Sequence, residues 1–388
     1  MKRFVAFFLC VVFFVCFAFP NAASESVTGS LPTVSASGTE LNLDAKGAIL
    51  MEAVTGTVLY GKDSDEKLYP ASVTKVMTML LVMEALQSGT VTEDDTVTAS
   101  ENACSYGGTQ IYLAPGETMS LRDLLKAVCI NSANDAAVAL AEHISGSETA
   151  FVSRMNERAA ELGAKNTHFV NPCGLPDGDH YTCAYDVALF TRELLNHPHI
   201  LEYTGIWTDS LRNGGFGLAN TNKLLRTYTG LTGMKTGYTQ EAGHCLSATA
   251  TRGDTTLIAV VLGGESSKGR FASAAALLDY GFSGYTFLRR SVGVLDPIPV
   301  IKGKIDKVSV SVDGEFCCVL QKNKTAALTV EVTTDESLQA PVSAGQTVGK
   351  AVLLQDGKEI ASLPVVADHG AEKAGFFDYF RKMLNSLF

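Results

Sequence analysis

The chain has 388 residues, which is enough for two domains and a sizeable buried core. It contains 41 acidic and 31 basic residues and has a formal net charge of −10 at pH 7. Because a surface that binds phosphate groups must be basic, this balance argues against nucleic acid as a partner.

The N-terminus has the layout of a secretory signal. Lys2 and Arg3 precede an unbroken apolar run over residues 4–19, and small residues around Ala23 provide a cleavage site. We predict that residues 1–23 are a signal peptide and that the protein works outside the cytoplasm. The apolar run is slightly long, so an uncleaved anchor is the alternative. Cleavage removes two basic residues and no acidic ones, which leaves 29 against 41 and a net charge of −12.

The cysteines do not indicate a metal site. Seven of the nine remain once the signal is removed, and their number and spacing do not match a set of metal ligands. Cys173 and Cys183 flank a loop-like stretch, and they either form a disulfide or stay free as thiols.

The first elements expected after the signal are a flexible lead-in, hairpins and helices. Residues 24–43 are rich in Ser, Thr and Gly, as in flexible linkers. Hairpins are expected over residues 47–60 and around residues 252–254. Three helices are expected between them, over residues 72–87, over residues 120–128 with a capping box at Ser120 and Asp123, and from Asn134 to about Gly146. Helices between two hairpins predict an antiparallel sheet covered by helices, an α+β domain over residues 44–284.

The rest of the chain changes character. Short alternating runs such as KVSVSV and ALTVEV predict a small all-β, sandwich-like domain over residues 285–366. In the tail, residues 367–388, apolar side chains recur at a helical spacing from Phe376 to Phe388. This segment is too short and too charged to span a bilayer, so we expect residues 374–388 to lie in a membrane interface.

The stretch PASVTK, residues 70–75, places a hydroxyl and an amine three residues apart at the start of a predicted helix. Ser72 and Lys75 would then share one face, and a lysine desolvated by the following apolar residues could take a proton from the serine. A capping serine followed by a surface lysine is the simpler interpretation of this motif taken alone.

Two further triplets change that balance. Ser132-Ala133-Asn134 lies between two predicted helices, and Lys235-Thr236-Gly237 follows a glycine-rich stretch and precedes a predicted strand. Each has an ordinary structural explanation, as a helix cap and as a solvated turn lysine. When all three occur in this order in an exported chain, these structural explanations are no longer more probable than a functional one.

Together these segments resemble the serine D-alanyl-D-alanine carboxypeptidases, the low-molecular-mass penicillin-binding proteins. The likeness extends to FVNPCGLPDGDHYTCAYDVALF, to the strands after Lys235 and to APVSAGQTVGKAVLLQDGKEI in the β-domain. It implies a β-lactamase/transpeptidase-like catalytic domain and a tail that associates with the outer face of the cytoplasmic membrane. Ala133 departs from the glycine common in the second motif, and Thr256 stands where some relatives carry arginine.

The resemblance implies a role for each motif residue. Ser72 would be the nucleophile, Lys75 its base, and Ser132 a proton relay to the leaving group. The substrate would be bound by Asn134, Lys235, Thr236, Gly237 and Arg270, and the oxyanion by the backbone N–H groups of Ser72 and Tyr238. No metal or cofactor is needed.

The implied reaction removes the terminal D-alanine of a peptidoglycan stem peptide, with β-lactams acylating the same serine. A DD-endopeptidase, a β-lactamase and a non-catalytic wall-binding protein are the alternatives. A class A β-lactamase needs a deacylating glutamate between the second and third motifs. Glu157 and Glu161 lie in that interval, but their surroundings predict a helix and do not resemble that glutamate's motif.

Overall fold

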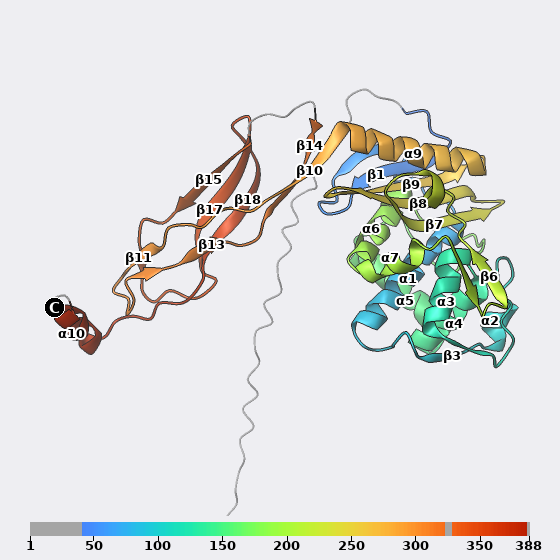
Figure 1. The fold of residues 1–388 in the computed structure, drawn as a ribbon, viewed down its shortest axis with the longest axis horizontal. Coiled ribbons are helices and arrows are strands. Elements are labelled where there is room, and N and C mark those ends of the chain that lie inside the picture. The colour runs from blue at the N-terminus through green and yellow to red at the C-terminus, as the bar shows by residue number, and fades with distance from the viewer. Residues whose placement is uncertain (1–40, 323–327, 386–388) are drawn as a thin grey trace, which may run out of the picture. The chain divides into compact units, whose positions relative to one another are not determined.

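The computed structural model describes residues 41–322 and 328–385 (Figure 1). The predicted signal peptide and most of the lead-in lie outside these residues. Within the described residues, each helix is too short or too polar to cross a membrane.

A five-stranded antiparallel sheet forms the centre of the first domain, with the strand order β2-β1-β9-β8-β7. Its strands are β1 (Gly47–Glu52), β2 (Val58–Lys62), β7 (Leu231–Thr239), β8 (Gly243–Arg252) and β9 (Thr255–Gly264). Both expected hairpins are therefore present, as β1-β2 and β8-β9. Because β7 is an edge strand, one side of its backbone can pair with an extended ligand.

Helices cover both faces of this sheet (Figure 1). Alternate residues of a strand point to opposite faces, so Ala48 and Leu50 of β1 pack in the core under α9, while Ile49 and Met51 pack in the core with α1. A strand covered on both faces must be apolar throughout, which explains the run GAILME.

The helices of this domain surround the larger core. They are α1 (Lys75–Gln87), α2 (Glu101–Ser105), α3 (Leu121–Lys126), α4 (Asn134–Ser145), α5 (Glu148–Glu161), α6 (Ala184–Leu195), α7 (Leu201–Thr204), α8 (Leu224–Thr227) and α9 (Ser267–Gly284). Short turns add the 3-10 helices η1 (Ala71–Thr74) and η3 (Pro198–Ile200) and the π-helical turn η2 (Ala127–Asn131). Two small hairpins pair β3 (Thr96–Thr98) with β4 (Thr118–Ser120) and β5 (Thr208–Leu211) with β6 (Phe216–Ala219).

The expected elements are present, with two corrections near the motifs. The Ser120 cap is confirmed, since its Oγ accepts the Asp123 N–H at 3.1 Å, and α4 ends before Gly146. The helix expected over residues 72–87 instead begins as η1, so Ser72 lies in a 3-10 turn ahead of α1. Lys235 lies within β7 and not in a turn before a strand, because β7 begins at Leu231.

The second domain consists of strands, as predicted. They are β10 (Tyr285–Arg290), β11 (Ile298–Ile301), β12 (Lys307–Val308), β13 (Val310–Val312), β14 (Phe316–Gln321), β15 (Leu328–Thr334), β16 (Leu338–Gln339), β17 (Thr347–Gln355) and β18 (Lys358–Ala367). They form sheets ordered β13-β18-β17-β15, β12-β11-β16 and β10-β14, with a separate apolar core. Helix α10 (Phe376–Asn385) follows.

The cysteines among the described residues are all free thiols, including Cys173 and Cys183. The structure therefore agrees with the thiol alternative for this pair and not with the disulfide.

Candidate active site

The side chains of Ser72 and Lys75 meet at the start of α1. The helical turn that links η1 to α1 brings both to one face, and Lys75 Nζ donates a hydrogen bond to Ser72 Oγ at 3.1 Å. This contact confirms the geometry expected from their spacing.

Lys75 is fully buried, which controls its protonation. Its Nζ also donates to Asn134 Oδ1 at 2.6 Å and to the Cys173 carbonyl at 3.0 Å. Burial lowers the pKa of Lys75 to about 8, and the nearby Cys173 and Asp135 oppose this shift only in part. An amine with this pKa is partly unprotonated near neutral pH, so it can act as a base toward Ser72 Oγ.

The second motif approaches Lys75 from another helix. Asn134 is the first residue of α4, and its Nδ2 donates to the Gly107 carbonyl at 2.7 Å while its Oδ1 accepts from Lys75. Ser132 follows η2 in the left-handed region at φ 67°, a backbone conformation that non-glycine residues adopt at a cost. Within the described residues its Oγ has no hydrogen-bond partner, so it is free to exchange a proton.

The third motif lies on β7. Lys235 is fully buried, and its Nζ donates to the Thr236 carbonyl at 2.9 Å. Burial, and then the positive charge of Lys75, hold the pKa of Lys235 well below its usual value. Thr236 Oγ1 donates to Thr221 Oγ1 at 2.6 Å. Thr221 was not expected from the sequence, and its hydroxyl orients that of Thr236.

Gly237 allows β7 to lie directly against the turn that carries the nucleophile. A Cβ at this position would lie 2.9 Å from both the Pro70 carbonyl oxygen and the Ser72 nitrogen, and 3.0 Å from the Val73 nitrogen. Only glycine permits this approach. The Ser72 N–H therefore lies beside the edge of β7 at Gly237. The next residue on this strand is Tyr238, whose N–H is the other predicted oxyanion donor.

Arg270 reaches β7 from α9. Its Nη1 donates to the Gly237 carbonyl at 2.7 Å and to the Cys245 carbonyl at 3.3 Å. In this structure the guanidinium thus fixes the backbone of β7 at Gly237, and a contact with a substrate carboxylate remains a prediction.

A loop over residues 167–183 completes the site and was predicted only as a family-like segment. Asn171 Oδ1 accepts the N–H groups of Cys173, Gly174 and Leu175, which fixes the carbonyl that accepts from Lys75. His180 Nδ1 accepts the Val170 N–H at 3.1 Å, so its Nε2 carries the proton that it donates to Thr74 Oγ1 at 2.8 Å. The sequence NPCGL, residues 171–175, is the only sequence signal for these contacts, because a backbone carbonyl can accept a hydrogen bond whatever its side chain is.

The two glutamates weighed for a β-lactamase lie on α5, as the predicted helix required. Glu161 forms ion pairs with Arg154 at 2.8 Å and Arg158 at 3.3 Å, and Glu157 lies 3.6 Å from Arg154. Both are engaged with arginines at the exposed side of that helix.

Comparisons with known proteins identify the same two domains. The D-alanyl-D-alanine carboxypeptidase family, peptidase S11, matches residues 33–266, and the penicillin-binding protein 5 C-terminal domain matches residues 292–373. D-alanyl-D-alanine carboxypeptidase DacF of Bacillus subtilis is 43% identical over 351 residues, covering 89% of this chain and 90% of the relative. DacC of Escherichia coli K12 is 34% identical over 376 residues, covering 92% of this chain and 90% of the relative.

Solved structures agree. Penicillin binding protein 5 from Haemophilus influenzae has a TM-score of 0.77 at 32% identity and covers 87% of this chain and all of its own. Penicillin-binding protein D2 from Listeria monocytogenes, solved with ampicillin bound, has a TM-score of 0.58 at 33% identity and covers 63% of this chain.

The fold and the site define a serine acyl-transfer enzyme with a transpeptidase-like α+β domain and a β-rich second domain. The chain belongs to the peptidase S11 family and is a serine-type D-alanyl-D-alanine carboxypeptidase, a penicillin-binding protein. Family membership implies D-Ala-D-Ala peptides as substrates and β-lactams as ligands.

Proposed function

We propose that the enzyme removes the terminal D-alanine from peptidoglycan stem pentapeptides through an acyl-enzyme on Ser72. The observation that carries this proposal is the 3.1 Å hydrogen bond between Ser72 Oγ and a buried lysine whose pKa is lowered to about 8. Lys75 takes the serine proton as Oγ attacks the carbonyl between the two D-alanines. The backbone N–H groups of Ser72 and Tyr238 then stabilise the oxyanion, each contributing about 2.7–4 kcal/mol.

The intermediate collapses by loss of D-alanine. Ser132 relays the proton from Lys75 to the leaving amine, so the amine departs neutral and an ester to Ser72 remains. Water then hydrolyses this ester and restores the free serine. Two observations support this role for Ser132. Its hydroxyl has no hydrogen-bond partner among the described residues, and it lies two residues before Asn134, whose Oδ1 accepts a hydrogen bond from Lys75.

The substrate is oriented by its free carboxylate. Lys235 and Thr236 bind this group, with Arg270 as a second cation, and Asn134 holds the peptide. Burial lowers the pKa of Lys235, and an anion beside this lysine stabilises its charged form, which favours a substrate that ends in a carboxylate. A β-lactam presents a strained amide and a carboxylate with the same spacing, so it acylates Ser72 as well.

Turnover of three compounds tests this proposal and separates it from the alternatives. We expect D-alanine release from a stem pentapeptide, slower cleavage of a cross-linked dimer, and a long-lived adduct with penicillin. Faster cleavage of the dimer would instead indicate an endopeptidase, and rapid turnover of penicillin a β-lactamase.

Ser72→Ala tests the nucleophile directly. The variant should release no D-alanine and form no covalent adduct with fluorescent penicillin, while its circular dichroism and melting temperature stay near those of the wild type. A covalent adduct at the site in this variant would show that another residue is the nucleophile.

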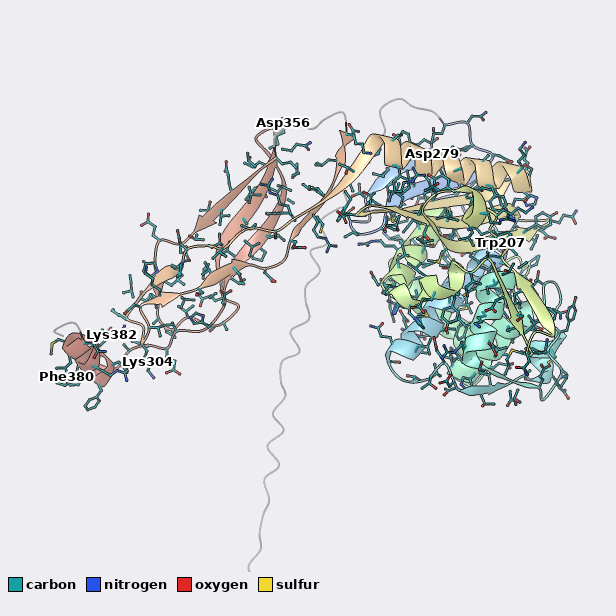
Figure 2. The ribbon with its side chains drawn as sticks, viewed as in Figure 1. Trp207, Asp279, Lys304, Asp356, Phe380 and Lys382 are labelled. Carbon is teal, nitrogen blue, oxygen red and sulfur yellow. The ribbon has the colours of Figure 1, made fainter. Side chains whose placement is uncertain are left out.

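We also propose that the protein is exported and peripheral on the outer face of the cytoplasmic membrane, held by residues 374–388. Helix α10 supports this, because Phe376 and Phe377 are 79% and 83% exposed and none of its residues is buried. Figure 2 labels Phe380 and Lys382 on this helix, with Lys304 close by. Leu387 and Phe388 of the predicted stripe lie outside the described residues.

A further inference from the structure

The proposed function fixes two points of the substrate on β7. The terminal carboxylate lies at Lys235, and the scissile carbonyl lies at Ser72, beside Gly237. The rest of the stem peptide must therefore continue along β7 past Tyr238, toward the turn that joins β7 to β8. The scissile carbonyl belongs to the fourth stem residue, and an extended residue advances about 3.3 Å, so the Cα of the third stem residue lies roughly 5 Å beyond that carbonyl.

A cavity of about 320 Å³ lies at this end of β7. Its walls include Tyr69, three residues before Ser72, and Glu241 and Ala242 from the turn after β7. The Cys245 thiol on β8 lies 3.7 Å from the Tyr69 carbonyl and 3.6 Å from that of Ala242, which ties this wall to the sheet beside the nucleophile. The volume suits a single large side chain.

The charges in this cavity do not cancel one another. Lys46, Lys67 and Glu241 line it together with Tyr181, and Lys67 Nζ lies 4.4 Å from the centre of the Tyr181 ring. That cation–π contact holds one ammonium in place. Among the residues that the structure describes, Lys46 and Glu241 have no ion pair, so their charges are available to a ligand.

We propose that this cavity binds the side chain of the third stem residue and selects one whose end carries both a carboxylate and an ammonium. The carboxylate pairs with Lys46 and Lys67, and the ammonium with Glu241. A side chain that ends only in an ammonium meets two like charges against one opposite charge, and an apolar side chain gains no ion pair. The inference rests on the proposed function, since β7 must bind the peptide in the stated direction.

Three N-acetylated peptides of the form X-D-Ala-D-Ala test this selectivity, with X as norleucine, lysine or meso-diaminopimelate. The concentration of active sites in the full-length enzyme is determined by titration with labelled penicillin, and kcat/KM is calculated per active site. Because the paired groups are partly exposed, we expect kcat/KM for diaminopimelate to exceed that for norleucine by about fivefold to tenfold, with lysine no better than norleucine.

The double variant Lys46→Met/Lys67→Met should reduce this ratio to near one. Lys165→Met, which removes an exposed lysine that does not line the cavity, should leave the ratio unchanged. Glu241→Gln should reduce the ratio of kcat/KM for the diaminopimelate peptide to kcat/KM for a fourth peptide, whose X side chain has the same length and carboxylate but no ammonium.

The outcomes separate the cavity from the catalytic proposal. Equal kcat/KM values for all three peptides in the wild type would overturn the subsite while leaving the carboxypeptidase reaction intact. A ratio that survives in the double variant would overturn the assignment to these lysines. Failure of the wild type to hydrolyse any of the peptides would overturn the proposed function and this inference with it.

Discussion

Two buried lysines, Lys75 and Lys235, dominate the site at the scale of single residues. Lys75 donates to Ser72, Asn134 and Cys173, whereas Lys235 Nζ donates only to the Thr236 carbonyl among the described residues. Burial lowers the pKa of both, and the charge of Lys75 lowers the pKa of Lys235 further. A carboxylate that arrives at Lys235 stabilises the charged form of Lys235, whereas Lys75 must be neutral to accept the serine proton.

The protonation of Lys75 predicts how acylation depends on pH. Since the neutral amine is the active form and its pKa is about 8, the acylation rate should rise from pH 6.5 to 9 with a midpoint near 8. Stopped-flow measurement of penicillin acylation gives the pH profile of this step alone, because the measured rate does not include product release. Lys75→Arg, which cannot lose its proton, should be slower by more than about a hundredfold throughout. A flat wild-type profile over this range would mean that another group is the base.

The role of Lys235 can be isolated by changing the enzyme and the substrate together. Charge-assisted hydrogen bonds contribute about 1.5–3 kcal/mol, so Lys235→Ala should slow peptide turnover and penicillin acylation by about ten- to a hundredfold. Amidation of the terminal carboxylate should harm the wild type far more than the variant, as a double cycle of kcat/KM values would show. Equal harm to both enzymes would remove Lys235 as the partner of the carboxylate.

At the scale of elements, the contact between β7 and η1 depends on the absence of a side chain at Gly237. The atoms that a Cβ would meet belong to the backbone of residues 70–73, so they cannot move aside without moving the nucleophile. Gly237→Ala should therefore lower the acylation rate by about a hundredfold or more and destabilise the fold by about 1–3 kcal/mol. Penicillin labelling and urea unfolding measure these effects.

Gly217 on β6 provides the matched control, because a Cβ there would meet no atom within 4 Å. Gly217→Ala should leave both measurements near wild type. If Gly237→Ala acylated at the wild-type rate, the close approach of β7 would have no part in positioning Ser72.

The 167–183 loop is fixed to the start of α1 by a buried neutral histidine. Burial lowers the pKa of His180 to about 4 from its usual 6.5. The unfolded chain binds this proton below about pH 6.5 and the folded chain does not until about pH 4, so the free energy of unfolding falls as the pH drops through this window. The contribution is up to roughly 3 kcal/mol.

His180→Gln should remove this part of the acid sensitivity. The measurement is the difference in unfolding free energy between pH 7 and pH 4.5, which does not depend on the absolute stability lost with the Thr74 contact. The exposed His369→Gln should keep the wild-type difference. An unchanged difference in His180→Gln would mean that folding does not lower the pKa of His180.

The sequence predicted the elements that carry a period or a short motif, and missed the parts of the site that the backbone builds. The two hairpins with helices between them predicted the sheet, and the spacing of Ser72 and Lys75 predicted the serine–lysine contact once the other two motifs were taken with it. The role of the Cys173 carbonyl was not predictable, since every residue has a carbonyl. Cys173 is 98 positions from Lys75 in the sequence, and only the fold brings the two together. The 3-10 geometry of η1 was also missed, because 3-10 and α-helices share the spacing that places i and i+3 together.

At the scale of the whole molecule, α10 presents two different faces. Lys382 Nζ on its polar side donates to the Gly303 carbonyl at 2.9 Å and pairs with Asp306 at 2.5 Å, which fixes the helix to the second domain. The apolar side chains that remain exposed on α10 are Phe376, Phe377, Phe380, Met383 and Leu384. With the polar side engaged, the aromatic side of the helix is the one available to a membrane.

This arrangement predicts membrane binding that is driven by apolar insertion. The mature chain is expected to carry a net charge of −12, so electrostatic attraction to anionic lipids should be weak, and binding to phosphatidylethanolamine–phosphatidylglycerol vesicles should survive 0.5 M salt. Deletion of residues 374–388 should leave active enzyme in the supernatant after sedimentation with these vesicles. Phe377→Ser/Phe380→Ser should weaken binding by more than about tenfold, because burial of each aromatic ring contributes about 1.5–3 kcal/mol.

The control for these aromatic residues is Ile301→Ser/Ile360→Ser, which removes two exposed apolar side chains from the strands of the second domain. It should bind vesicles as the wild type does, since insertion requires a continuous apolar face and not isolated exposed residues. Unchanged vesicle binding by the truncated enzyme would exclude α10 as the anchor. Loss of binding in 0.5 M salt by the intact protein would instead assign the attraction to Arg381 and the other cations of the tail.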